Sequence, residues 1–117
     1  MATFAKNKLS GSTDGRAILI TTTATAGTLI HTAVAGTGTD FDEVWLWAMN
    51  NSSEDRILTL EWGGVTAPND LVKSPIRVIG GLVLIMPGLI LQNTTIVRAF
   101  AAVANDLQIL GFVNEIR

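Results

Sequence analysis

An apolar repeat of two residues, found in several short runs, is the feature that most constrains how this chain can fold. Between Leu58 and Trp62 every second residue is large and apolar, and the residues in between are more polar. In a β-strand, such alternation places the apolar side chains on one face. No repeat of 3.6 residues is sustained long enough to indicate a helix. The sequence therefore predicts an all-β fold.

Eight runs of this type are separated by turn signals. The first two runs are expected to pair as a hairpin around Gly27, and the last two around residues 104–106. Pro87 and Gly88 are expected to end the sixth run. Eight short strands fit an antiparallel β-sandwich of the jelly-roll or Greek-key type, and we expect the jelly-roll. The eight runs span residues 17–23, 28–34, 43–50, 56–62, 76–79, 82–86, 95–103 and 107–113.

The first sixteen residues differ in composition from the rest of the chain. They carry Lys6, Lys8 and Arg16, and no run of β type lies among them. A short polar segment buries too little apolar surface to offset the entropy of its own ordering. We therefore expect a flexible N-terminal arm over residues 1–16 and a single β-sandwich domain over residues 17–117. The three cations of the arm are candidate contacts to a partner.

Charged residues are scarce. They make up 15% of the chain, against about 25% in an ordinary soluble domain, which indicates surface held in a permanent contact. The net charge of −2 argues against binding to nucleic acid, which requires a basic patch. The longest run without a polar side chain, residues 79–91, is shorter than the roughly 20 residues of a membrane-spanning helix. We expect neither a nucleic acid nor a membrane as partner.

Side chains suited to catalysis are few. His31 is the only histidine, cysteine is absent, and no serine lies in a nucleophile-elbow pattern. We expect His31 to be a hydrogen-bonded or interface residue. The acidic segment 40–43 lacks the glycine and distal glutamate of a calcium loop, and residues 36–38 lack the lysine and helix of a phosphate loop. The sequence predicts no enzyme, no cofactor and no metal site.

The strand predicted over residues 43–50 is apolar on both faces. Trp45, Trp47 and Met49 point to one side, and the aliphatic residues between them point to the other. One face meets the core, and the other meets a second layer or a neighbouring subunit; the sequence leaves open which is which. Trp45, Trp47 and Met49 are therefore candidate contacts in a homo-oligomer or with another partner.

Five segments resemble small structural proteins of tailed bacteriophages, and together they span most of the chain. They are KLSGSTDGR at 8–16, IHTAVAGT at 30–37, FDEVWLWA at 41–48, LEWGG at 60–64 and GFVN at 111–114. The resemblance implies a capsid decoration, or cement, protein, which is a small β-domain, often trimeric, that docks on the outside of the head. These segments have no catalytic meaning, so no functional residue is carried over from the resemblance.

The expected function is therefore that of a non-enzymatic virion protein. It is made in the host cytoplasm, forms a homo-oligomer, with a trimer preferred, and binds the major capsid protein on the capsid exterior. The alternative is a carbohydrate-binding β-sandwich in which exposed Trp45, Trp47 or Trp62 stacks on sugar rings. Neither function requires a catalytic residue.

Overall fold

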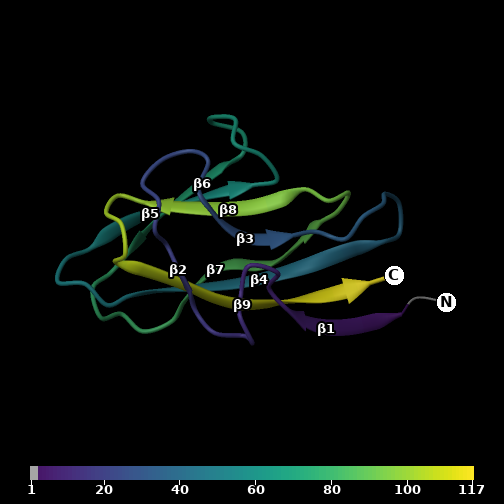
Figure 1. The fold of residues 1–117 in the computed structure, drawn as a ribbon, viewed down its shortest axis with the longest axis horizontal. Coiled ribbons are helices and arrows are strands. Elements are labelled where there is room, and N and C mark those ends of the chain that lie inside the picture. The colour runs from purple at the N-terminus through teal and green to yellow at the C-terminus, as the bar shows by residue number, and fades with distance from the viewer. Residues whose placement is uncertain (1–2) are drawn as a thin grey trace.

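A computed structural model describes residues 3–117, which form nine strands and contain no helix. The all-β prediction is therefore confirmed, with one strand more than expected (Figure 1). Residues 3–117 therefore include no helix that could span a membrane. The strands are β1 (Phe4–Lys8), β2 (Ile18–Leu19), β3 (Thr28–Thr32), β4 (Phe41–Asn50), β5 (Arg56–Trp62), β6 (Leu71–Ile76), β7 (Val83–Leu91), β8 (Ile96–Ala101) and β9 (Leu107–Ile116).

Two antiparallel sheets pack face to face as a β-sandwich. Sheet A has the order β1-β9-β4-β7, with β2 also paired to β9, and sheet B has the order β3-β8-β5-β6. In Figure 1 the strands of sheet B lie above those of sheet A and run broadly along the same long axis. The predicted sandwich is confirmed. The jelly-roll connection within it stays a prediction.

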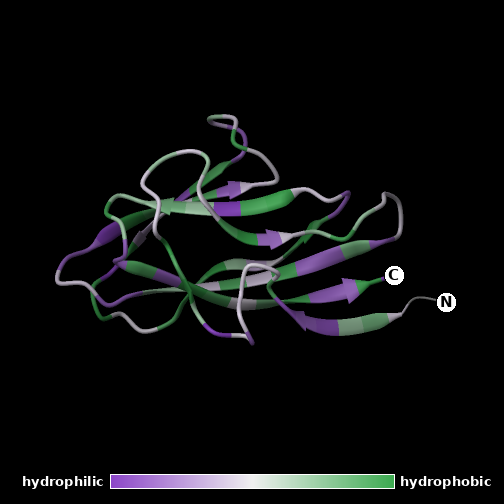
Figure 2. Ribbon diagram, viewed as in Figure 1, coloured by the Kyte–Doolittle hydropathy of each residue, from purple (hydrophilic) through white to green (hydrophobic). Residues whose placement is uncertain are grey.

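Strict alternation of side chains builds the core between the sheets. Along β4 every second residue is buried, with the aliphatic side chains pointing inward and the tryptophans outward. Each aliphatic side chain removed from water contributes about 1.5–3 kcal/mol. Figure 2 shows the resulting change between hydrophobic and hydrophilic positions along the strands. Fully buried core residues include Ile20, Ile30, Val44, Leu46, Ala48, Leu58, Ile76, Val97, Ala99, Leu107, Ile109 and Val113.

Both predicted hairpins are wrong. The β2 strand pairs with β9 in sheet A, whereas β3 pairs with β8 in sheet B. Likewise, β8 and β9 are consecutive but belong to opposite sheets. A short connection can also carry the chain across the sandwich, so its length does not reveal which strands pair. Among the described strands, β5 and β6 are the one consecutive pair that shares a ladder.

The sequence analysis expected Pro87 and Gly88 to end the strand at residue 86. In the structure this strand, β7, continues to Leu91. Its register against β4 skips Gly88 and Ile85, so that two bulges interrupt the ladder. An edge strand tolerates a proline because one side of its backbone needs no partner. The expected strand over 76–79 is replaced by β6, which ends at Ile76.

The expected flexible arm is corrected within the described residues. Residues 4–8 form β1, which pairs with β9 in continuous register, and Leu9 is 1% exposed in the core. The Gly11 amide also donates to the Ile30 carbonyl at 2.9 Å. All five β1 side chains are exposed, so backbone pairing holds this strand without the apolar signal that marks the others. Residues 1 and 2 of the predicted arm lie outside the described part.

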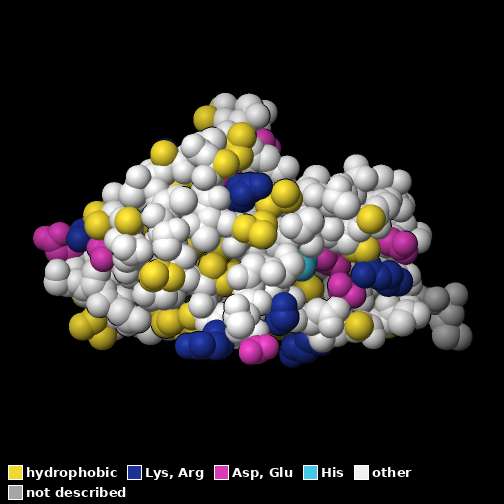
Figure 3. Space-filling model, in the orientation of Figure 1, with side chains coloured by type: hydrophobic (Ala, Val, Ile, Leu, Met, Phe, Trp, Pro, Cys, Tyr) yellow, Lys and Arg dark blue, Asp and Glu magenta, His cyan; other side chains and the backbone are white. Residues whose placement is uncertain are grey.

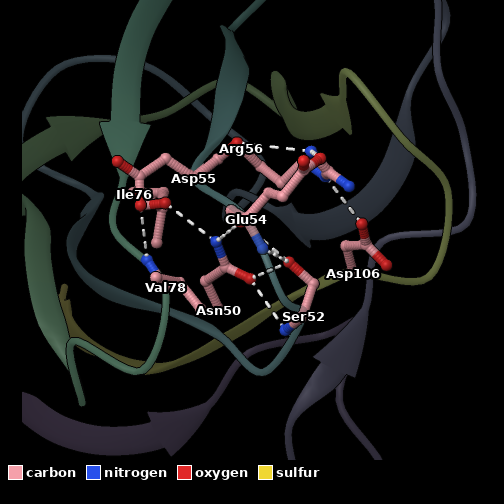
Figure 4. Close-up of polar contacts among 8 residues, drawn as sticks. All are labelled: Asn50, Ser52, Glu54, Asp55, Arg56, Ile76, Val78 and Asp106. Atoms are coloured by element: carbon pink, nitrogen blue, oxygen red, sulfur yellow. Dashed lines mark hydrogen bonds and ion pairs between the residues drawn. The ribbon is translucent and has the colours of Figure 1, made fainter.

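A polar cluster closes one end of the sandwich (Figure 4). The Asn50 side-chain amide donates to the carbonyl oxygens of Glu54 and Ile76 at 2.8 and 2.9 Å. Arg56 Nε donates to Asp106 Oδ2 at 2.7 Å, and Arg56 Nη1 donates to Glu54 Oε2 at 3.0 Å. These two carboxylates, Asp106 first, raise the pKa of Arg56. Because Asn50 belongs to sheet A and Ile76 to sheet B, the cluster joins the two sheets.

Candidate interaction surface

Three aromatic rings pack together on the outer face of sheet A. Trp45 and Trp47 come from β4, and Phe112 comes from β9, where it is paired with Trp45. The ring centroids are 6.3 Å apart for Trp45 and Trp47, 6.3 Å for Trp45 and Phe112, and 5.9 Å for Trp47 and Phe112. The interplanar angles are 18–29°. This aromatic cluster is half-buried and lies outside the sandwich core, so it is the outward face that the sequence left unassigned.

A carboxylate orients one ring of the aromatic cluster. Glu43 Oε1 accepts a hydrogen bond from Trp45 Nε1 at 2.7 Å and a second from Asn114 Nδ2 at 3.0 Å. Both donors favour the ionised carboxylate, so they lower the pKa of Glu43 below its usual 4.5, with Trp45 contributing most. The indole nitrogen is thereby occupied within the chain.

The predicted cations do not act as one group. Lys6 Nζ lies 4.2 Å from the ring centroid of Phe112, in cation–π contact with the aromatic cluster. Lys8 Nζ instead donates to the Ser12 carbonyl at 3.1 Å. Arg16 lies at a separate hollow lined also by residues of β2. Figure 3 shows charged side chains mainly at the two ends and along the lower edge of this view.

Met49, the third predicted contact on β4, lies farther along the same face. It is half-buried and paired with Gln108. The third ring of the aromatic cluster is Phe112, which the sequence analysis did not propose as a contact. Its membership depends on the register of β9 against β4, which no local pattern reveals.

The free edge of sheet A is apolar along its whole length. Among the described strands, the edge strand β7 pairs with β4 alone, and no charged residue occurs between Arg77 and Arg98. Edge strands of stable monomers usually carry charges that prevent contact with other chains. We call this region the β7 edge; its exposed members are Ile79, Leu82, Val83, Leu84, Leu89 and Ile90.

The aromatic cluster and the β7 edge are continuous. In the β4–β7 register, Leu84 is opposite Trp47 and Pro87 is opposite Trp45. Gly88 lies beneath the Trp45 ring, where a Cβ atom would collide with the indole. An apolar surface therefore extends from Phe112 across both tryptophans to the edge of the sheet. The run 79–91 was the sequence signal for its outer part, but the sequence alone did not identify it as an edge strand.

His31 is buried and hydrogen-bonded, as predicted. Its Nδ1 accepts from the Ser10 amide at 3.0 Å, so its Nε2 carries the proton and donates to Asp42 Oδ2 at 2.7 Å. The Val34 amide donates to the same carboxylate oxygen at 3.1 Å. A general base needs a free ring nitrogen facing the substrate. In His31 the nitrogen that would take a proton is already engaged by a backbone amide.

The acidic segment 40–43 does not converge on a common point. Asp42 points into the sandwich toward His31, whereas Glu43 points to the outer face toward Trp45. The alternation of a strand separates their carboxylates. Among residues 3–117, no group of three or more histidine or acidic side chains is placed to hold a metal ion.

The three tryptophans do not form one platform for a sugar. Trp62 packs against the core from sheet B, whereas Trp45 and Trp47 lie on the outside of sheet A. These two rings stack on each other and on Phe112, and Lys6 lies over Phe112. The three tryptophans therefore do not present one common stacking surface.

No family model, curated protein or solved structure matches the chain.

Proposed function

We propose that the chain is a non-enzymatic structural protein of a tailed-phage virion, which binds the major capsid protein on the capsid exterior and stabilises the shell. The observation that carries this proposal is the continuous apolar surface of the aromatic cluster and the β7 edge. A small monomer rarely exposes so much contiguous apolar surface, so the surface supports a subunit of a permanent assembly. The resemblance of the five sequence segments supplies the class of assembly, a phage head, and with it the major capsid protein as the partner.

The construction of the molecule supports a static role. Its one histidine is buried, and both ring nitrogens are hydrogen-bonded within the chain. The polar cluster at Asn50 and Arg56 joins the two sheets rather than lining a cleft. A protein that clamps neighbouring capsid subunits needs a rigid body and contact area, and a two-sheet sandwich provides both.

We also infer that the sandwich is a jelly roll. From β3 onward the chain changes sheet at every connection except β5–β6, and the first and last strands are paired. This interleaving of nine strands in two sheets is compatible with two Greek keys. Jelly rolls occur in viral capsid proteins and in lectins, so the fold agrees with both functions considered above.

Binding to phage heads tests the proposed function. Empty heads of the phage that encodes the chain, stripped of this protein, are mixed with the purified full-length chain and sedimented through sucrose. We expect the chain to sediment with the heads, to saturate at a fixed ratio to the major capsid protein, and to raise the temperature at which the heads rupture. Absence from the head fraction, together with glycan binding that quenches tryptophan fluorescence, would instead support the carbohydrate-binding alternative.

A further inference from the structure

The β7 edge is the part of the molecule that most needs a partner. Ile79 is 82% exposed, Leu82 56% and Ile90 54%, values that are unusual for large aliphatic side chains. Neither the core nor the polar cluster covers them. An apolar, unpaired edge of this kind leads to uncontrolled aggregation unless something specific occupies it.

The form of this edge determines how a partner can bind. The β7 strand contains Pro87, which has no amide hydrogen, and two bulges at Gly88 and Ile85. These features disrupt the regular row of donors and acceptors that another strand would need for pairing. The sheet therefore does not continue into a neighbouring chain. The contact is made by side chains.

The distribution of charge favours a second copy of the chain as the occupant. Beside a rotation axis, each side chain meets its own equivalents from the other copies. A charged residue at that place would face like charges, and their desolvation would oppose association. The β7 edge lies in the stretch between Arg77 and Arg98 that has no charged residue. On the neighbouring strand, Glu43 lies opposite Ile90, where its carboxylate is engaged by Trp45 and Asn114. Leu84 lies opposite Trp47, so copies can meet at Leu84 without repulsion.

We infer that the β7 edge lies on the rotation axis of a homo-oligomer, where Leu84 meets its equivalents from the other copies. This inference rests on the proposed function. It names the surface through which copies of the chain associate. The adjoining aromatic cluster extends the same interface, with Lys6 at its polar rim. The capsid is then left to contact a different face of the chain.

Two variants test the axis by measuring the mass of the particle. Leu84→Lys places a charge on the β7 edge, and Ile57→Lys is the matched control on the outer face of sheet B, because Leu84 is 45% and Ile57 46% exposed. By sedimentation velocity at micromolar concentration, we expect the wild type and Ile57→Lys to sediment as the oligomer and Leu84→Lys to fall to the 12.4 kDa monomer. A monomeric wild type, or an unchanged mass for Leu84→Lys, would overturn the inference.

Cross-linking keeps the test decisive even where a charge prevents folding. Since the chain has no cysteine, a single Leu84→Cys can form a disulfide only with another copy. Under mild oxidation we expect a covalent dimer for Leu84→Cys and little for the Ile57→Cys control. Equal cross-linking at both positions would contradict the inference.

Binding to heads separates this inference from the proposed function. If the oligomer forms through Leu84 but does not bind heads, the proposed function fails and the axis stands. If a monomeric chain binds heads, the assignment of the axis fails and the proposed function stands.

Discussion

His31 and Asp42 illustrate how single polar residues hold the N-terminal segment against the sandwich. His31 links the Ser10 amide to the Asp42 carboxylate, and both side chains are almost fully buried. The second carboxylate oxygen, Asp42 Oδ1, has no hydrogen-bond partner. The His31 and Val34 donors are therefore what compensates the burial of this acid.

Removing the histidine should destabilise the fold strongly. His31→Ala leaves the Asp42 carboxylate without its side-chain donor and the Ser10 amide without its acceptor, and we expect a loss of about 3–5 kcal/mol. Urea denaturation followed by tryptophan fluorescence measures it. The control is Asp42→Asn, which keeps a hydrogen-bond acceptor for His31 and removes the charge, and should cost less. Equal stability of His31→Ala and the wild type would contradict the role given to the pair.

Glu43 should make stability depend on acid. Its pKa is lowered in the folded chain by the Trp45 and Asn114 donors, so the unfolded chain binds its proton first as the pH falls. The stabilisation is fully present above the ordinary value of 4.5 and is lost as the pH falls from there through the lowered folded pKa. Denaturation of wild type and Glu43→Gln between about pH 2 and 7 should show a smaller acid-dependent loss in the variant. Parallel curves would show that the two hydrogen bonds do not bias ionisation.

Several of these residue positions follow from the sequence alone. Alternation in β4 separates Val44 and Leu46 from Trp45 and Trp47, and the structure confirms that the two sets lie on opposite faces. Phe112 could not be placed with the tryptophans, because its contact depends on a register between strands more than sixty residues apart in the chain. Long-range register leaves no local pattern.

At the scale of elements, the sequence identified strands better than it identified their partners. The prediction for β5, residues 56–62, matches the structure. The hairpins predicted from Gly27 and from residues 104–106 are wrong, since the chain crosses between sheets at both places. Alternation of apolar residues predicts that one face of a strand is buried. It does not predict which other strand forms the backbone hydrogen bonds.

The β1 strand was missed because it lacks the pattern on which the prediction depended. Its side chains are all exposed, and its pairing with β9 uses backbone groups that every sequence has. The core contact of this segment is made by Leu9, immediately after the strand. A single buried leucine in a polar stretch is too weak a signal to indicate an ordered segment.

Truncation should separate β1 from Leu9. Deleting residues 3–8 removes no core side chain, so we expect the shortened chain to fold with a small loss of stability. Leu9→Ala in the full chain removes a 1% exposed side chain and should cost about 2–5 kcal/mol. Denaturation midpoints of the two variants give the comparison. A truncated chain that does not fold would show that the backbone ladder with β9 is essential.

The whole molecule combines an apolar surface at one edge of sheet A with cations around its N-terminal segment. Association through the β7 edge depends on burial of apolar area, which sodium chloride screens very little. Attachment to a capsid through Lys8 and Arg16 would depend on charge, if these residues meet an acidic surface, and would weaken as salt shortens the screening length from about 10 Å at 0.1 M. The two contacts should therefore respond differently to salt.

A salt titration can distinguish the two contacts in one preparation. Between about 0.05 and 0.5 M sodium chloride, we expect the oligomer mass to stay constant, because apolar burial is not screened, while the amount bound to heads falls as exposed charge pairs weaken. The double variant Lys8→Gln/Arg16→Gln should bind heads more weakly at low salt and lose most of that salt dependence, yet sediment as the same oligomer. Lys73→Gln, an exposed cation on sheet B, is the matched control and should behave like the wild type. An oligomer that dissociates with salt, or a double variant with unchanged head binding, would show that the apolar edge and the cations do not divide the two contacts in this way.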